Sequence, residues 1–176
     1  MSVLSLALGL AHAGHAGQFR HDGVTPYVTH PIRVGQMLFR LPPFYQATAV
    51  IHDLMEDNKA ITPEVLLASG LPPVVVAAAG YLTRDDGEIY AHFIERIIGD
   101  KDGLGYTEGQ RIAAMVKVVD IMDNLMDGTR APTMVRRYVN ALKLLIQSFP
   151  EIETNLAQCP RPDGKGSLLS LWSVIS

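Results

Sequence analysis

The stretch AVIHDLMEDN, residues 49–58, places four ionisable side chains directly after an apolar run: His52, Asp53, Glu56 and Asp57. Side chains four residues apart lie on the same face of a helix, so the stretch carries two such pairs. Burying ionised groups is costly unless they are paired or bind a metal. The pattern therefore predicts a helix over residues 43–56 whose charged side chains belong to a functional site.

The helical period extends along most of the chain. It predicts helices over residues 2–17, 30–40, 43–56, 62–69, 72–82, 87–99, 107–127 and 132–147. Turn-forming and helix-breaking residues separate these segments at Asp22-Gly23, Pro42-Pro43, Gly70, Pro72-Pro73, Asp102-Gly103 and Gly128. Strand-like alternation does not extend beyond a few residues. The expected fold class is therefore all-α.

The length of 176 residues is that of a single domain with a sizeable core. We expect the functional domain to cover residues 1–150 and a C-terminal tail to cover 151–176. Helical periodicity fades in the tail around CPRPDGKGS. Two alternatives stay open for the tail, namely a short helix around Leu168–Val174 or partial disorder.

Composition excludes several classes of protein. The net charge of −3 gives no bulk basic field, so neither a nucleic acid nor a membrane is an expected partner. The first residues, MSVLSLALGLAHAGHAG, are expected to form an ordinary helix rather than a secretory signal, because no Lys or Arg precedes the apolar run. The single Cys159 excludes an internal disulfide and fits a reducing, cytoplasmic location. Composition leaves the oligomeric state open.

Two more motifs add possible metal ligands, His30 in PYVTHPIRVG and Asp120 in VKVVDIMDN. With the first stretch they complete a His₂Asp₂ set: His30, His52, Asp53 and Asp120. Imidazole with carboxylate suits Mn²⁺, Fe²⁺ or Zn²⁺. Asn124 lies one turn after Asp120 and can face the same cleft, whereas Asp123 and Asp127 are expected to be exposed. Glu56 and Asp57 then remain for proton transfer.

Three ordered blocks, GQFRHDGVTPYVTHPIRVG, AVIHDLMEDN and VKVVDIMDNL, resemble the hydrolase domain of RelA/SpoT proteins within the HD superfamily. The resemblance covers roughly residues 5–147. It is greatest to the small stand-alone alarmone hydrolases, which include metazoan SpoT homologues. It implies an HD-type bundle of about eight helices and a Mn²⁺ cofactor. It also implies a small nucleotide substrate, (p)ppGpp, cleaved to GDP or GTP plus pyrophosphate, with (p)ppApp as a further candidate substrate.

The resemblance also implies roles for individual residues. The metal ligands would be His30, His52, Asp53 and Asp120. Glu56 and Asp57 would activate and orient the attacking water. Arg20 would pack on the purine and Asn124 would lie near the nucleotide. Several cations are candidates for binding the phosphates: Arg84, Lys117, Arg130, Arg136 and Arg137. Lys117 has a second interpretation, as a residue that only solvates its helix.

The chain departs from the family pattern at three places. His21 replaces the lysine that commonly follows Arg20, which weakens a phosphate contact at neutral pH because free imidazole titrates near ~6.5. Asn58 replaces a threonine, and Asp123 replaces the histidine that commonly precedes the asparagine. Two other functions stay open on the same residues. One is a different HD phosphohydrolase, such as a 5′-nucleotidase, and the other is a catalytically silent nucleotide sensor.

Overall fold

The computed structural model describes residues 1–99, 105–126, 128 and 130–175. Regular structure in these residues is helical apart from two isolated β-bridges, so the prediction of an all-α fold is confirmed. The predicted break at Asp102-Gly103 and the side chain of Asp127 lie outside the described residues. None of the helices within the described ranges combines the length and the apolar character needed to cross a membrane.

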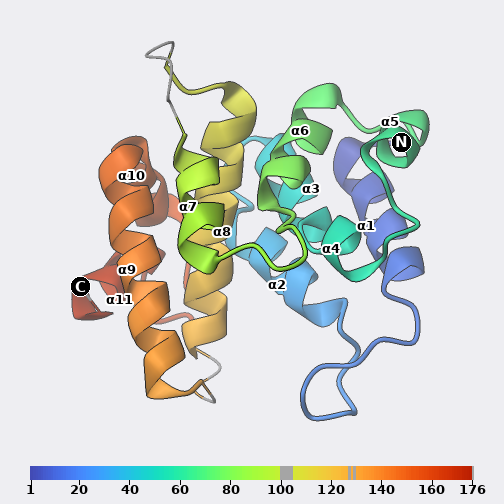
Figure 1. Ribbon diagram of the computed structural model, residues 1–176. Coiled ribbons are helices and arrows are strands. Elements are labelled where there is room, and N and C mark those ends of the chain that lie inside the picture. Colours follow the sequence, from blue (N-terminus) through green and yellow to red (C-terminus); the bar gives the residue numbers. More distant parts are fainter. Residues whose placement is uncertain (100–104, 127, 129, 176) are drawn as a thin grey trace.

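The helices are arranged around α8, which runs through the middle of the molecule (Figure 1). Along the chain they are α1 (Val3–Gly14), α2 (Thr29–Met37), α3 (Pro43–Ile51), α4 (Leu54–Asp57), α5 (Pro63–Ala68), α6 (Pro73–Leu82), α7 (Tyr90–Ile98), α8 (Glu108–Met126), α9 (Pro132–Ser148), α10 (Glu151–Gln158) and α11 (Leu168–Ile175). On one side α8 packs against α2, α3 and α6, and on the other against α7 and α9. This arrangement places α8 at the centre of the main hydrophobic core.

Local sequence explains why α8 is long and where it begins. The Thr107 hydroxyl accepts the Gln110 N–H at 3.2 Å, and the Gln110 side-chain oxygen accepts the Thr107 N–H at 2.9 Å. This reciprocal pair is a capping box, which satisfies two N–H groups at the start of a helix. No glycine or proline follows between residues 110 and 126. The helix therefore extends uninterrupted past the side chains that it brings to the centre of the molecule.

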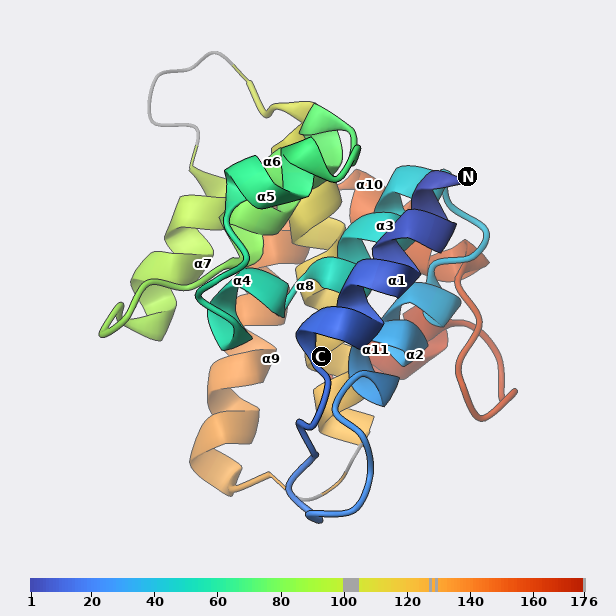
Figure 2. The same ribbon diagram turned by 90° about the vertical axis from the view of Figure 1, so that its right-hand side faces the viewer.

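A smaller hydrophobic cluster lies between α1, α3 and α6 and contains Ala11, Ile51 and Val75. In Figure 2, α1 and α3 lie side by side in front of α8. Gly35 on α2 permits the close approach of α3, because a β-carbon there would lie 2.9 Å from a Val50 methyl group. The two clusters together hold α2 and α3 against α8.

The helix predicted over 43–56 is divided in two, since α3 ends at Ile51 and α4 begins at Leu54. The cause is local. The His52 Nδ1–H donates to the Ala49 carbonyl at 2.7 Å, the carbonyl that an unbroken helix would bond to the Asp53 N–H. The break places His52 and Asp53 at a turn, where both side chains face α2 and α8.

The tail folds onto the main core. Of the two alternatives for residues 168–174, the short helix is the one present, and it is α11. A further helix, α10, precedes it and was not predicted from the sequence. Leu156, Leu168 and Trp172 belong to the same buried cluster as the apolar face of α8. The apolar spacing of Ile152, Leu156 and Cys159 was the available signal for α10.

Leu168→Ala is expected to lower the free energy of unfolding by about 2–5 kcal/mol, the usual cost of truncating a buried leucine. Leu168 is fully buried. Urea unfolding followed by circular dichroism would measure the change. Val174→Ala on the same helix is the matched control, because Val174 is exposed and its truncation should change stability by less than about 0.5 kcal/mol. Equal stability of both variants would contradict the packing of α11 on the core.

Candidate metal centre

Three buried side chains from three helical segments meet beside α8. His30 comes from α2, His52 from the turn after α3, and Asp120 from the middle of α8. A ligand atom of each lies within 4.8 Å of the others, which is close enough to hold one metal ion. They are 4%, 2% and 4% exposed. The predicted partnership of these three residues is therefore present in the fold.

Asp53 lies beside the same three side chains. Its Oδ2 atom is 3.1 Å from His52 Nε2 and 3.8 Å from His30 Nε2. On the opposite side, Asp120 Oδ1 is 3.0 Å from His30 Nε2 and 3.6 Å from His52 Nε2. Two imidazole nitrogens and two carboxylate oxygens thus lie close together. The group close enough to hold one ion comprises His30, His52 and Asp120, and Asp53 as a fourth ligand stays a prediction.

The hydrogen bonds of His52 decide which ring nitrogen is available. A carbonyl oxygen only accepts, so Nδ1 must carry the proton that it shares with Ala49. In the neutral ring, Nε2 then presents a lone pair, and this buried atom has no hydrogen-bond partner. A lone pair beside the Asp53 and Asp120 carboxylates is repulsive unless a proton or a cation lies between them. The donor set fits a divalent cation bound by nitrogen and oxygen.

The pKa values report the same concentration of negative charge. Burial lowers the pKa of the His52 imidazole, but the carboxylates of Asp53 and Asp120 outweigh burial and raise that pKa well above its ordinary value. Burial raises the pKa of the Asp120 carboxyl, but the ammonium group of Lys117 and the two imidazoles hold it well below its ordinary range. Both shifts have the same physical cause, which is that these side chains favour a positive charge among them, either protons or a metal ion.

The centre opens into a pocket of about 450 Å³. Its lining is rich in cations and aromatic rings: Phe19, Arg20, His21, Tyr27, His30, Asp53, Glu56, Arg84, Lys117, Asp120, Asn124, Arg130 and Tyr138. Arg136 and Arg137 are not among these residues and line a separate pocket beside Tyr90. A ligand bound near the metal centre would therefore meet several positive side chains.

Lys117 belongs to the pocket rather than to the solvated surface of α8. Its side chain is 14% exposed, and its Nζ donates to Asp120 Oδ2 at 2.8 Å. It also lies 5.2 Å above the centre of the Phe93 ring. The interpretation that Lys117 only solvates its helix is wrong, because α7 and the rest of the core cover that face of α8.

The residues expected to bind the nucleotide line the pocket together. The Asn124 side-chain N–H donates to Asp120 Oδ1 at 2.8 Å, and Arg130 donates to the Asn124 oxygen. His21 Nε2 lies 3.3 Å from a terminal nitrogen of Arg130. Arg20 is a further wall residue. The first loop and the start of α9 are thus connected to the metal centre through Asn124.

The two carboxylates of α4 have different positions. Glu56 lines the pocket, and its Oε2 accepts the Arg84 backbone N–H at 3.1 Å while its Oε1 lies 4.0 Å from the Arg84 guanidinium. Asp57 is not among the lining residues and has its Oδ2 3.9 Å from His15 Nδ1. Burial and, after it, the charge of Asp53 raise the pKa of the Asp57 carboxyl. Glu56 is therefore the better placed to meet a bound substrate.

Sequence reasoning missed two residues that contact the metal ligands. Tyr27 donates its hydroxyl to Asp53 Oδ2 at 2.7 Å, and no local pattern predicted that contact. Asp123 was expected to be exposed, but it is 1% exposed and accepts a hydrogen bond from His30 Nδ1. The expectation was wrong because α2 covers this side of α8. Ile121 and Met122, the apolar neighbours used for Asp120, were an available signal for Asp123 as well.

No family model matches this chain, and no curated protein gives a significant match. The likeness to RelA/SpoT hydrolases therefore stays a resemblance carried by three short blocks. Fold alone does not define function, so the functional assignment depends on the geometry and charge of the site.

Proposed function

We propose that this protein is a metal-dependent phosphohydrolase that removes the 3′-pyrophosphate of guanosine alarmones, (p)ppGpp. The observation that carries the proposal is the buried His–Asp cluster at the base of a pocket lined by cations. An enzyme acting on a polyphosphate needs both features, namely a site for a divalent cation and positive groups for the phosphates.

The residues proposed to hold Mn²⁺ are His30, His52, Asp53 and Asp120. A mixed set of nitrogen and oxygen ligands suits Mn²⁺, and the absence of thiolate argues against a structural zinc of the cysteine type. When bound, the ion would polarise a phosphoryl oxygen and lower the pKa of a water molecule. Tyr27 supports this site from outside by fixing Asp53 through its hydroxyl.

The other residues supply proton transfer and charge. In the proposed reaction, a water oxygen attacks the phosphorus that is bonded to the ribose 3′ oxygen. The bond between this phosphorus and the 3′ oxygen breaks, and the 3′ oxygen takes a proton. We assign the role of proton acceptor to Glu56, because Glu56 lines the pocket. Asp57 lies outside the lining and would act only through its charge. Lys117, Arg84 and Arg130 face the charge that develops on the phosphoryl oxygens.

The proposed substrate is a small cytoplasmic nucleotide. The free thiol of Cys159 fits the same reducing compartment. Arg20 and the aromatic side chains of Phe19 and Tyr138 offer flat surfaces on which a purine can stack. Stacking depends little on base identity, so (p)ppApp belongs to the same proposed substrate class.

Incubation of the purified protein with Mn²⁺ and ppGpp is expected to yield GDP and pyrophosphate, and excess chelator should abolish the reaction. Anion-exchange chromatography of the nucleotides, with an enzymatic assay for pyrophosphate, would resolve the products. Orthophosphate as the first product would favour a generic HD phosphohydrolase. Binding of ppGpp with no turnover at any divalent metal would favour a nucleotide sensor. Unchanged activity in chelator, with no metal found by elemental analysis, would contradict the metal centre itself.

A further inference from the structure

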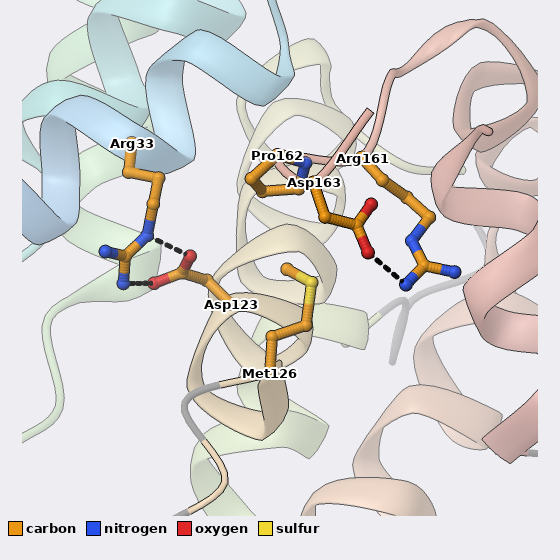
Figure 3. Close-up of a pocket in the computed structure, with 6 residues that line it drawn as sticks. All are labelled: Arg33, Asp123, Met126, Arg161, Pro162 and Asp163. Atoms are coloured by element: carbon orange, nitrogen blue, oxygen red, sulfur yellow. Dashed lines mark hydrogen bonds and ion pairs between the residues drawn. The ribbon is translucent and has the colours of Figure 1, made fainter. Parts of the chain in front are cut away.

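The carboxylate of Asp123 is held by two side chains of α2. Its Oδ2 accepts the His30 Nδ1–H at 2.8 Å. Arg33 binds both oxygens, with Nε 2.5 Å from Oδ1 and a terminal nitrogen 2.7 Å from Oδ2. Figure 3 shows this two-bond contact between Arg33 and Asp123. Since Asp123 is 1% exposed, protein groups rather than water satisfy its charge.

This contact determines which nitrogen of His30 faces the metal centre. An ionised carboxylate only accepts hydrogen bonds, so the proton lies on Nδ1 and the neutral ring presents Nε2 as its lone pair. Nε2 is the atom that lies 3.0 Å from Asp120 Oδ1. The two-bond contact with the Arg33 guanidinium, which is always charged, keeps the Asp123 carboxylate ionised.

The two histidines of the centre are oriented in different ways. His52 is fixed by a main-chain carbonyl, that of Ala49, which no side-chain substitution removes. His30 is fixed by a side chain, which is itself fixed by another. The orientation of His30 therefore depends on Asp123 and Arg33, whereas that of His52 is built into the backbone.

We propose that Arg33 and Asp123 are positioning residues that set the tautomer and orientation of His30 and thereby the affinity of the centre for a divalent cation. The proposal deepens the metal-dependent function proposed above and rests on that metal centre. Partners in the outer shell of a metal ligand typically change metal affinity by 10–100-fold. Asp123 is the contact to His30, and Arg33 acts through Asp123.

The contact between Arg33 and Asp123 also lines another pocket, of about 470 Å³, which shares no lining residue with the substrate pocket. Arg33 and Asp123 form one wall of it, and Arg161, Pro162 and Asp163 of the loop between α10 and α11 form the other (Figure 3). Arg161 donates to Asp163 and does not take part in the contact with Asp123. Arg161 is therefore a matched control for Arg33, because both are arginines of one pocket paired with an aspartate.

The test is calorimetric titration of Mn²⁺ into the metal-free protein without nucleotide. Asp123→Asn is expected to weaken Mn²⁺ binding by about 10–100-fold, because the amide offers one acceptor oxygen to two donor groups. Arg33→Gln should weaken binding between about twofold and tenfold, since it acts one contact further out. Arg161→Gln should leave the affinity unchanged. Arg33→Gln in the Asp123→Asn background should add little, because the two residues act through one contact.

Histidine ¹⁵N resonances supply a readout that mere loss of stability would not move. In the unaltered metal-free protein, at a pH at which the ring is neutral, His30 should carry its proton on Nδ1, and Asp123→Asn should give a mixture of tautomers. Unchanged Mn²⁺ affinity and an unchanged His30 tautomer in Asp123→Asn would overturn the inference, as would an equal loss in Arg161→Gln. Failure of the unaltered protein to bind Mn²⁺ would overturn it too. Metal binding with these losses but without alarmone hydrolysis would contradict the proposed reaction alone.

Discussion

Asp120→Asn is expected to release bound Mn²⁺ and to lower hydrolysis by about 10³-fold, the scale of losing a group that stabilises charge in the transition state. Asp120 Oδ1 lies 3.0 Å from His30 Nε2 and 3.6 Å from His52 Nε2, the two imidazole nitrogens that face the proposed metal site. The amide keeps the size of the side chain and removes its negative charge, so metal affinity should fall while the fold is retained. Elemental analysis after desalting and kcat with excess Mn²⁺ would measure both effects.

The matched control for Asp120→Asn is Asp86→Asn. The Asp86 side chain is 89% exposed and pairs with Lys59, outside the pocket. This variant should retain full metal content and full activity. Stoichiometric Mn²⁺ in Asp120→Asn, with kcat within a few fold of the unaltered protein, would remove Asp120 from the ligand set.

Glu56→Gln should lower kcat by roughly 10²–10⁴-fold, the usual range for losing acid–base assistance, with metal content unchanged. Glu56 lines the pocket but is not in the group of side chains that could hold a metal ion. The glutamine oxygen can still accept the Arg84 N–H, so the position of the side chain should be retained while its ability to take a proton is lost. Steady-state kinetics at saturating Mn²⁺ would separate kcat from KM.

Two comparisons sharpen the test of Glu56. Glu64→Gln, at the exposed first turn of α5, should have no effect on kcat. Asp57→Asn should lower kcat less than Glu56→Gln, because Asp57 does not line the pocket. Loss of metal in Glu56→Gln, with kcat per bound ion intact, would assign Glu56 to metal binding instead of proton transfer.

The positions of most helices follow from local sequence. The prediction of a helix over 107–127 corresponds to α8, Glu108–Met126, and the predicted start at Thr62-Pro63 corresponds to the cap of α5. Each helical hydrogen bond joins residues only four apart, so the necessary information is contained in a short window. The break after Ile51 was not predicted, because it depends on one side chain competing for a backbone carbonyl.

The metal ligands were predictable for a similar reason. His52 follows an apolar run directly, and Asp120 lies between apolar pairs, so the burial of these two residues could be inferred from their neighbours. Buried ionisable groups need partners or a metal, which made a shared site the natural expectation. Their convergence at distances of 3.0–3.8 Å agrees with that expectation.

Contacts between segments far apart in the sequence could not be predicted from local sequence patterns. Asp123 has an apolar pair on its N-terminal side only, and it was expected to be exposed, because its partner His30 lies 93 positions away. Tyr27 and Asp53 are 26 positions apart, and Glu56 reaches the backbone of Arg84 across 28. Periodicity along one helix indicates which residues share a face. Whether that face is buried depends on another helix that packs against it, and the sequence of the first helix does not contain that information. The packing of α2 against α8 therefore buried Asp123, and the packing of α10 and α11 on the main core incorporated the tail. The position of α4 separated Glu56, which lines the pocket, from Asp57, which does not.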